Sequence, residues 1–274
     1  MQQGPASTRM RVRKMKLSRG SIEAVIDPAA GGRLASLRLD GEEVLVVNGE
    51  GATEWGCYPM VPWAGRVRNG QFMGAGGRVQ LPINCPPHAL HGTVFDAPWE
   101  FTGPRSLRSD LGRHWPWAGE VRSSFGVTED SFEWRMEVRA DCEAFPVVLG
   151  WHPWFRRSLS GGGRVTLDFE ATEMYRRDRD GIPAGDRIRP TPGPWDDCFA
   201  GLTAPPRLTW SCGRALQLES SCSHWVVYDQ PSHAVCVEPQ SGPPDAFNLG
   251  EAQWVEPGVP VVHTLRIQNV SSLP

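Results

Sequence analysis

The sequence lacks any apolar run that approaches the roughly 20 residues needed for a membrane helix, and no apolar stretch follows its basic N-terminal segment. We therefore expect neither a membrane-spanning helix nor a secretory signal. The seven cysteines are odd in number and include no Cys-x-x-Cys pair, so the pattern predicts neither a disulfide framework nor a cysteine-based zinc site. These absences favour reduced thiols in a cytoplasmic protein that does not bind membranes.

An excess of positive charge is also missing. The net charge is −3 and the pI is near 6.2, whereas nucleic-acid binding requires a clustered positive surface. This slightly negative net charge gives no support for a nucleic-acid partner and favours a small, polar, uncharged ligand. A basic cluster lies at the N-terminus, where we expect residues 1–16 to form a disordered leader before a single domain at 17–274.

Long amphipathic helices are absent as well. Thirty glycines and 25 prolines interrupt the chain throughout, and no apolar pattern at helical spacing lasts beyond about three turns. Between the interruptions lie short alternating or β-branched runs, with turn signals at Asp40-Gly41 and at 129–131. Strands are expected at 21–27, 33–39, 44–47, 121–127, 132–138, 147–152, 165–169, 216–218, 224–228, 234–238 and 264–268. The pattern predicts an all-β fold, a many-stranded antiparallel sandwich in one domain.

Two of these runs carry side chains suited to proton transfer. Strand alternation places Cys236 and Glu238 on one face, where small neighbours leave space for a ligand and partial burial favours a raised pKa for the Glu238 carboxyl. An exposed strand-end glutamate fits the same run equally well. In the second run Gly150 leaves room beside His152, which titrates near neutral pH; a histidine satisfied at a strand end is the ordinary alternative.

Three further polar residues are candidates for binding a ligand. His91 precedes a glycine that permits close backbone approach, and Arg66 lies in a tight loop that can present its guanidinium to hydroxyls or a carboxylate. Asp196, followed by Asp197, can accept hydrogen bonds from sugar hydroxyls. A surface arginine and a turn-capping aspartate explain the same residues without a ligand.

The sequence is rich in tryptophan, with twelve residues. Flat aromatic faces suit the C–H faces of sugar rings, although most tryptophans in β proteins are packed in the core. We expect Trp63, Trp151 and Trp154 at the rim of a pocket because they flank the candidate polar residues. Two proline- and glycine-rich segments, 57–72 and 239–249, are expected to be loops of the same site.

Five segments occur in an order that is informative as a set. They are Pro59–Phe72 (PMVPWAGRVRNGQF), Leu90–Gly92 (LHG), Gly150–Phe155 (GWHPWF), Asp196–Phe199 (DDCF) and Val235–Asn248 (VCVEPQSGPPDAFN). Together they resemble the aldose 1-epimerase family, over the chain from about residue 20 to its end. The first and last segments are the most specific, and the proline after the site histidine resembles the shorter bacterial members.

The resemblance implies a large antiparallel β-sandwich of the galactose mutarotase-like type, the supersandwich, in a single domain. It implies an isomerase that interconverts the α and β anomers of an aldose by ring opening and re-closure, with no cofactor and no metal. Glu238 is then the general base and His152 the general acid, while His91, Arg66 and Asp196 hold the sugar. We expect a monomer or homodimer that acts on a small-molecule sugar or sugar phosphate.

Three alternatives stay open on the sequence. A hexose-6-phosphate 1-epimerase of the same family follows if Arg68, Arg156 and Arg157 add positive charge at the rim of the cleft. A non-catalytic carbohydrate-binding protein would keep the cleft without turnover. A glycosidase normally uses two carboxylates, whereas the candidates here are a carboxylate and an imidazole.

Overall fold

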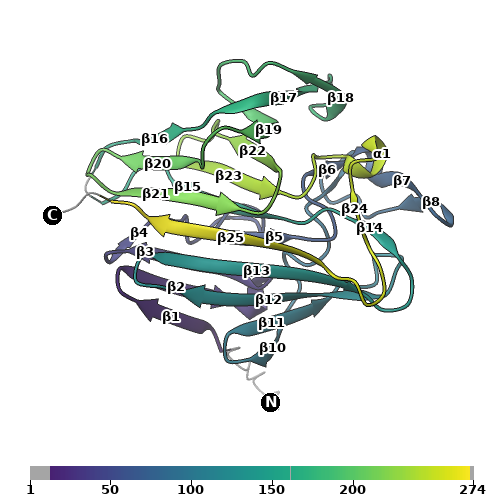
Figure 1. Cartoon of the computed structure of the whole chain (residues 1–274), viewed down its shortest axis with the longest axis horizontal. Helices are drawn as coiled ribbons and strands as arrows, with labels where there is room; N and C mark the ends of the chain where they lie inside the picture. The colour runs from purple at the N-terminus through teal and green to yellow at the C-terminus, as the bar shows by residue number, and fades with distance from the viewer. Residues whose placement is uncertain (1–12, 161, 272–274) are drawn as a thin grey trace, which may run out of the picture.

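The computed structural model describes residues 13–160 and 162–271, which are almost entirely β-structure (Figure 1). The larger of two antiparallel sheets has eleven strands. In spatial order its main path is β1 (Met15–Arg19), β2 (Ile22–Asp27), β3 (Arg33–Leu39), β5 (Cys57–Met60), β15 (Gly150–Arg156), β23 (Ala234–Gln240), β22 (His224–Tyr228), β19 (Asp196–Leu202), β17 (Ala171–Arg177) and β18 (Pro183–Ile188), with β4 (Glu42–Glu43) beside β3. The β17–β18 hairpin ends this sheet, at the top of Figure 1.

The second sheet has eight strands and packs against the first. Its order is β10 (Glu100–Gly103), β11 (Ser106–Asp110), β12 (Gly119–Val127), β13 (Ser131–Ala140), β25 (Val261–Asn269), β21 (Ala215–Ser220), β20 (Arg207–Trp210) and β16 (Val165–Asp168). Three two-stranded sheets complete the β-structure: β14 (Phe145–Val147) with β24 (Gln253–Val255), β6 (Arg66–Val67) with β9 (Ala89–Leu90), and β7 (Gln71–Gly74) with β8 (Gly77–Gln80). The described helices are short: α1 (Ala246–Leu249), η1 (Pro28–Ala30) and η2 (Arg68–Gly70).

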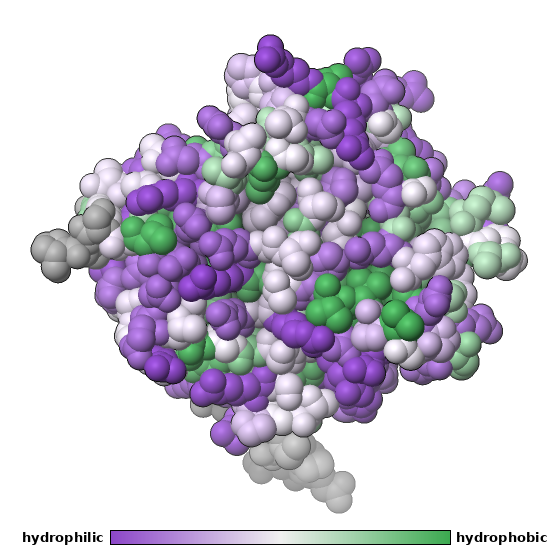
Figure 2. Space-filling model, viewed as in Figure 1, coloured by the Kyte–Doolittle hydropathy of each residue, from purple (hydrophilic) through white to green (hydrophobic). Residues whose placement is uncertain are grey.

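Strand alternation separates the two faces of the large sheet. On β23, Val235 and Val237 join the main core between the sheets, while Ala234 and Cys236 belong to a second cluster on the opposite face. Because successive side chains point to opposite faces, Glu238 shares the face of Cys236. The outer surface seen in Figure 2 is mostly hydrophilic, with separate apolar patches. The core therefore lies between the sheets, and the other face of the large sheet is free to carry a site.

The all-β sandwich predicted from the sequence is confirmed, and β3 and β22 have the predicted bounds. The strand at 33–39 is β3, and the hairpin of β12 and β13 pairs Val121 with Val138 and Val127 with Phe132. At the other predicted turn Asp40 and Gly41 both have positive φ, 50° and 78°, as a two-residue hairpin turn requires. No described helix is long and apolar enough to cross a membrane, and all seven cysteines are free.

Most predicted strand bounds shift by one to three residues, and segment 57–72, expected to be a loop, contains β5, β6 and the start of β7. Three further predictions differ from the structure. No strand forms at residues 44–47, because the strand that pairs with β3 after the turn is only Glu42–Glu43. Within this run Leu45 makes an isolated bridge with Phe155. The run 147–152 divides between β14 and β15, whose partners are different strands. Of the predicted leader, residues 1–12 lie outside the described residues, but Met15 and Lys16 already pair with β2. The leader therefore cannot extend to residue 16, because apolar Met15 is buried in the core.

Candidate active site

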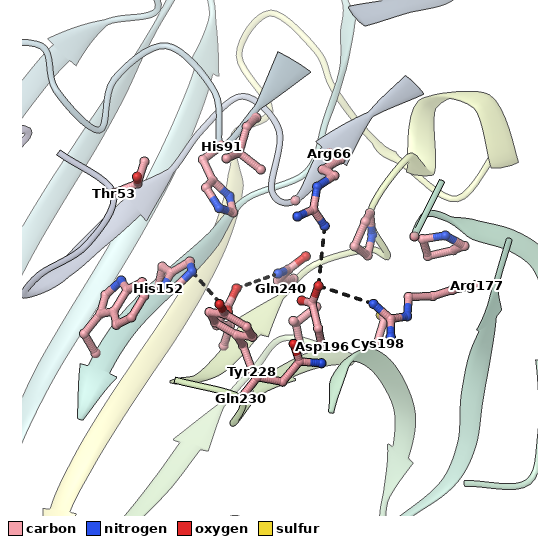
Figure 3. Close-up of a pocket in the computed structure, with 18 of the residues that line it drawn as sticks. Thr53, Arg66, His91, His152, Arg177, Asp196, Cys198, Tyr228, Gln230 and Gln240 are labelled. Atoms are coloured by element: carbon pink, nitrogen blue, oxygen red, sulfur yellow. Dashed lines mark hydrogen bonds and ion pairs between the residues drawn. The ribbon is translucent and has the colours of Figure 1, made fainter. Parts of the chain in front are cut away.

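A pocket of about 310 Å³ opens on the face of the large sheet that points away from the second sheet (Figure 3). Its floor comes from the central strands β15 and β23. Its walls come from β5, β22, β19 and the end of β17, and from the loop that leads into β6 and the turn after β9. Cavities of this size accommodate small ligands, with a few convergent polar groups to orient them.

His152 and Glu238 meet on the pocket floor. In the antiparallel pairing of β15 with β23, Gly150 lies opposite Gln240. His152 and Glu238, each two positions further along its strand from that pair, therefore face the same side of the sheet. Nε2 of His152 lies 3.2 Å from Oε1 of Glu238, and the two residues are only 5% and 2% exposed. Nε2 of Gln240 donates a hydrogen bond of 3.3 Å to Oε2 of Glu238. The fold thus brings together the two residues that the sequence marked for proton transfer.

Burial disfavours the charged form of both partners. It raises the pKa of the Glu238 carboxyl well above its ordinary value, with a further contribution from the negative charge of Asp196. It lowers the pKa of the His152 imidazole to about 3. Their contact has the geometry of an ion pair. However, a neutral pair that shares one proton agrees better with the raised pKa of Glu238 and the lowered pKa of His152. We therefore infer that burial favours the form of the pair in which both groups are neutral and one proton is shared between them.

Aromatic rings hold the His152 imidazole in place. The ring of Tyr58 stacks on it with centroids 4.8 Å apart, and the ring of Trp154 stacks on it at 5.3 Å. The hydroxyl of Tyr58 donates to the carbonyl of Thr53, and the guanidinium carbon of buried Arg33 lies 5.4 Å from the Tyr58 ring centroid. These contacts fix the imidazole plane, in which Nε2 faces Glu238.

His91 enters the same floor from the turn after β9. Its backbone has a φ of 59° and the following Gly92 a φ of 83°, a left-handed turn that directs the imidazole towards His152. The two imidazole rings make an edge contact with centroids 5.1 Å apart. Burial and the neighbouring His152 lower the pKa of His91 well below its ordinary value, and its Nδ1 is buried without a partner. A neutral imidazole here is available to hydrogen-bond a ligand.

A network of two arginines and two aspartates forms one wall of the pocket. Asp196 Oδ2 lies 3.7 Å from Nη1 of Arg66 and 3.3 Å from Nη1 of Arg177. Nε of Arg177 also lies 2.7 Å from Oδ1 of Asp197. Burial raises the pKa of Asp196, while both arginines oppose that shift. The wall therefore offers donors and acceptors with little net charge, which suits hydroxyl groups.

The structure corrects two of the three tryptophan predictions. Trp63 and Trp151 are buried in the main core between the sheets. Trp63 packs against Trp115 with ring centroids 6.0 Å apart, and Trp151 against Trp134 at 6.2 Å. Trp151 is one residue from His152, and strand alternation points neighbours to opposite faces. Trp154, two residues from His152, lines the pocket as predicted.

The arginines proposed to bind a phosphate are also corrected. Arg68, Arg156 and Arg157 are not among the described residues that line the pocket. Arg68 instead pairs with Asp178 and Asp180 in the turn of the β17–β18 hairpin, at 2.6 and 2.9 Å. The positive groups in the pocket wall are Arg66 and Arg177, and both face Asp196.

Several pocket residues escaped the sequence reasoning. Gln240 was detectable, since it lies two positions after Glu238 on the same face. Tyr58 adjoins the first family segment but precedes it. Arg177 lies in no recognisable motif, and only the pairing of β17 with β19 brings it to Asp196.

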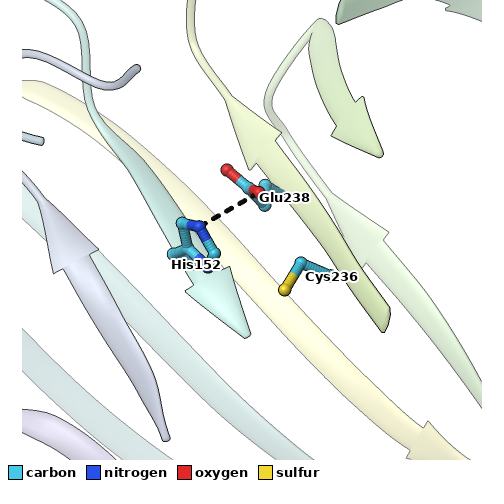
Figure 4. Close-up of side chains that lie close together, drawn as sticks. All are labelled: His152, Cys236 and Glu238. Atoms are coloured by element: carbon cyan, nitrogen blue, oxygen red, sulfur yellow. Dashed lines mark ion pairs between the residues drawn. The ribbon is translucent and has the colours of Figure 1, made fainter. Parts of the chain in front are cut away.

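Three donor atoms at the pocket floor, two of them from residues that line the pocket, are close enough to hold a metal ion. The side-chain donor atoms of His152, Cys236 and Glu238 lie within 4.8 Å of one another, and all three residues are buried (Figure 4). Sequence spacing gave no sign of such a group because the imidazole comes from a different strand, far away in the chain. The described residues thus contain a possible metal-ligand set inside the candidate site.

Comparisons with known proteins agree with this architecture. Among solved structures, a galactose mutarotase-like protein from Clostridium acetobutylicum superposes with a TM-score of 0.83 at 14% identity, covering 93% of this chain and 94% of the other. Galactose 1-epimerase from Lactobacillus acidophilus gives 0.76 at 16% identity, covering 94% of each chain. At these identities the likeness establishes a shared fold.

Similarity of sequence points to the same family. The uncharacterized Escherichia coli protein YphB is 30% identical over 110 residues, and that match spans 38% of this chain and 38% of YphB. The family model for aldose 1-epimerase matches residues 13–268, nearly the whole chain. The chain therefore belongs to the aldose 1-epimerase family.

Proposed function

We propose that this chain is an aldose 1-epimerase that interconverts the α and β anomers of a free sugar. The proposal depends on one observation: the 3.2 Å contact between His152 and Glu238 on the floor of a small polar pocket. An acid and a base that share one proton are what ring opening of a cyclic hemiacetal needs. Family membership supports the same reaction.

The proton moves in a closed cycle. In the reactive form the proton of the pair is on Nε2 of His152, and Glu238 is a carboxylate. Glu238 removes the proton from the anomeric hydroxyl while His152 protonates the ring oxygen, and the C1–O5 bond breaks to give the open-chain aldehyde. Both protein groups are then neutral, the state that their burial favours. Rotation about C1–C2 and closure with the roles reversed give the other anomer.

The remaining polar residues are assigned to binding the sugar. His91 hydrogen-bonds the sugar near its ring oxygen, and Arg66 and Asp196 hydrogen-bond hydroxyls at the wall. Trp154 packs against an apolar face of the ring. Arg66 and Arg177 are already compensated by Asp196 and Asp197, so the wall favours an uncharged sugar over a sugar phosphate.

His152→Asn tests the assignment of the acid. The asparagine side chain keeps polarity and approximate size but has no proton to exchange near neutral pH, so anomer exchange is expected to fall by about 10²–10⁴-fold. Exchange-spectroscopy NMR on glucose, galactose and glucose 6-phosphate measures the rate for each sugar, with the uncatalysed rate subtracted. A wild-type rate in the variant would remove His152 from the mechanism, and a strong preference for the phosphate would replace the free-sugar proposal.

The pH profile provides a second test. Because burial lowers the pKa of His152 to about 3, the pair gains a second proton only near that pH. Because the pKa of Glu238 is raised, the pair loses its shared proton only well above the ordinary range of a carboxyl. The profile of kcat/KM is therefore expected to have an acidic limb from His152 and an alkaline limb from Glu238, with a plateau between them.

This assignment of the limbs reverses the simpler expectation of an acidic limb from the carboxylate and an alkaline limb from the imidazole. Polarimetry between about pH 3 and about pH 10 measures kcat/KM, and circular dichroism at each pH checks that the fold persists. A fall centred near pH 6.5, where an ordinary histidine titrates, would contradict the shared-proton pair.

A further inference from the structure

Cys236 has no part in the proposed acid–base chemistry, yet it lies against both residues that do. It precedes Glu238 by two positions on β23, so the two side chains share a face of the strand. It also pairs across the sheet with Trp154, two positions after His152 on β15. All three residues are buried, and their donor atoms lie within 4.8 Å of one another (Figure 4).

The chemistry of these donors is specific. Imidazole nitrogen, thiolate sulfur and carboxylate oxygen are the ligands that zinc uses in proteins, at about 2.0–2.3 Å. Ligand atoms around a tetrahedral ion of that size are roughly 3.3–3.7 Å apart, and the nitrogen–oxygen distance here is already 3.2 Å. Small side-chain rotations would close the remaining distances. Three protein ligands then leave the fourth position directed into the pocket, as in catalytic zinc sites.

The surroundings favour such a site. The stacked rings of Tyr58 and Trp154 hold the imidazole in one plane, and Gln240 hydrogen-bonds the far oxygen of the Glu238 carboxylate. Outer contacts of this kind orient ligands and strengthen metal binding. The ligands come from two paired strands at the centre of the sheet, where backbone positions are fixed.

We propose that His152, Cys236 and Glu238 bind a thiophilic divalent cation of the zinc class, and that the bound ion blocks anomer exchange. Binding displaces the proton shared by the His152–Glu238 pair and the thiol proton of Cys236, and both leave to solvent. The ion then occupies the imidazole nitrogen and the carboxylate that the sugar needs, so ion and proton transfer exclude each other. The inhibition rests on the proposed function, whereas the binding does not.

Binding is tested directly with Co²⁺ and Zn²⁺ on the full chain. Co²⁺ is expected to give a near-ultraviolet charge-transfer band from thiolate ligation in the wild type, and Zn²⁺ to abolish that band by competition. Cys236→Ala is expected to lose the band and to weaken Zn²⁺ binding in calorimetry by at least about tenfold. The matched control is Cys222→Ala, which removes another buried thiol that lies outside this group and should keep both signals.

Inhibition is tested by anomer exchange with increasing Zn²⁺. Relative to its own metal-free rate, Cys236→Ala is expected to require at least about ten times more Zn²⁺ for half inhibition than the wild type. Mg²⁺, which prefers oxygen ligands, inhibits neither protein. If the alanine variant folds poorly by circular dichroism, Cys236→Ser takes its place. Equal Zn²⁺ affinity in wild type and variant overturns the proposal. If the wild type shows no anomer exchange but binds Co²⁺ through Cys236, the proposed function fails and the metal site stands.

Discussion

Glu238→Gln is expected to abolish anomer exchange and at the same time to raise the free energy of unfolding at pH 7. The amide cannot accept the proton of the anomeric hydroxyl, so the rate should fall by about 10²–10⁴-fold. The amide is nearly isosteric, can donate to Nε2 of His152, and can still accept the hydrogen bond from Gln240. Sugar binding should therefore survive the loss of turnover.

The gain in stability follows from the raised pKa of Glu238. A carboxyl with a higher pKa in the folded state contributes its full stability below the unfolded value, about 4.5. That contribution is lost progressively as pH rises towards the folded value. Each unit of difference is worth about 1.4 kcal/mol, and glutamine does not titrate. The variant should therefore be more stable than the wild type at pH 7, with a smaller difference at pH 4.

Urea unfolding at the two pH values measures this difference, and NMR anomer exchange measures the rate. Glu23→Gln on β2 is the matched control, because that side chain is exposed and far from the pocket; neither rate nor stability should change by much. A variant that is less stable than the wild type at pH 7 would show that the carboxylate is stabilised in the fold, contrary to the neutral pair.

Gly92→Ala is expected to destabilise the fold and to displace His91 from the pocket. A Cβ at this position would lie 1.9 Å from the carbonyl oxygen of Val61, which accepts a hydrogen bond from Thr93. The nearest atoms all belong to the Val61 backbone, so no flexible side chain can move aside. The φ of Gly92 is 83°, in the left-handed region. Overpacking costs about 1–3 kcal/mol and left-handed backbone about 1–2 kcal/mol more, so a loss of about 2–5 kcal/mol should follow, with weaker sugar binding.

Gly258→Ala separates the two causes. Gly258 has a similar φ of 81° but no atom within 4 Å of its would-be Cβ, so this variant should lose only the backbone contribution. Thermal and urea unfolding give the stabilities, and the KM for sugar reports the position of His91. Equal losses in the two variants would mean that the contact with Val61 is relieved by a backbone shift.

The sequence predicted most about features that alternate within one strand. The faces of β23 and β15 follow from a period of two, and so does the placement of Glu238 and His152 on the pocket floor. The same period contradicts the pocket assignment of Trp151, which is next to His152 on β15 and therefore points into the core. The other mistakes arose where loop geometry or a partner strand decides. Trp63 was assigned to the pocket because it flanks candidate polar residues in the sequence, but loop geometry turns it into the core. Arg177 reaches Asp196 only through the pairing of β17 with β19, and no local pattern encodes that pairing.

The order of strands in the large sheet divides the pocket into parts of unequal rigidity. The floor belongs to β15 and β23, with four strands on either side along the main path, whereas Arg177 belongs to the terminal hairpin. Segments at the edge of a sheet open locally at lower free energy than its centre. Under the proposed function, insertions or substitutions in the hairpin are expected to alter which hydroxyl pattern is preferred, while the proton-transfer geometry of β15 and β23 stays unchanged. Selectivity could then evolve independently of chemistry.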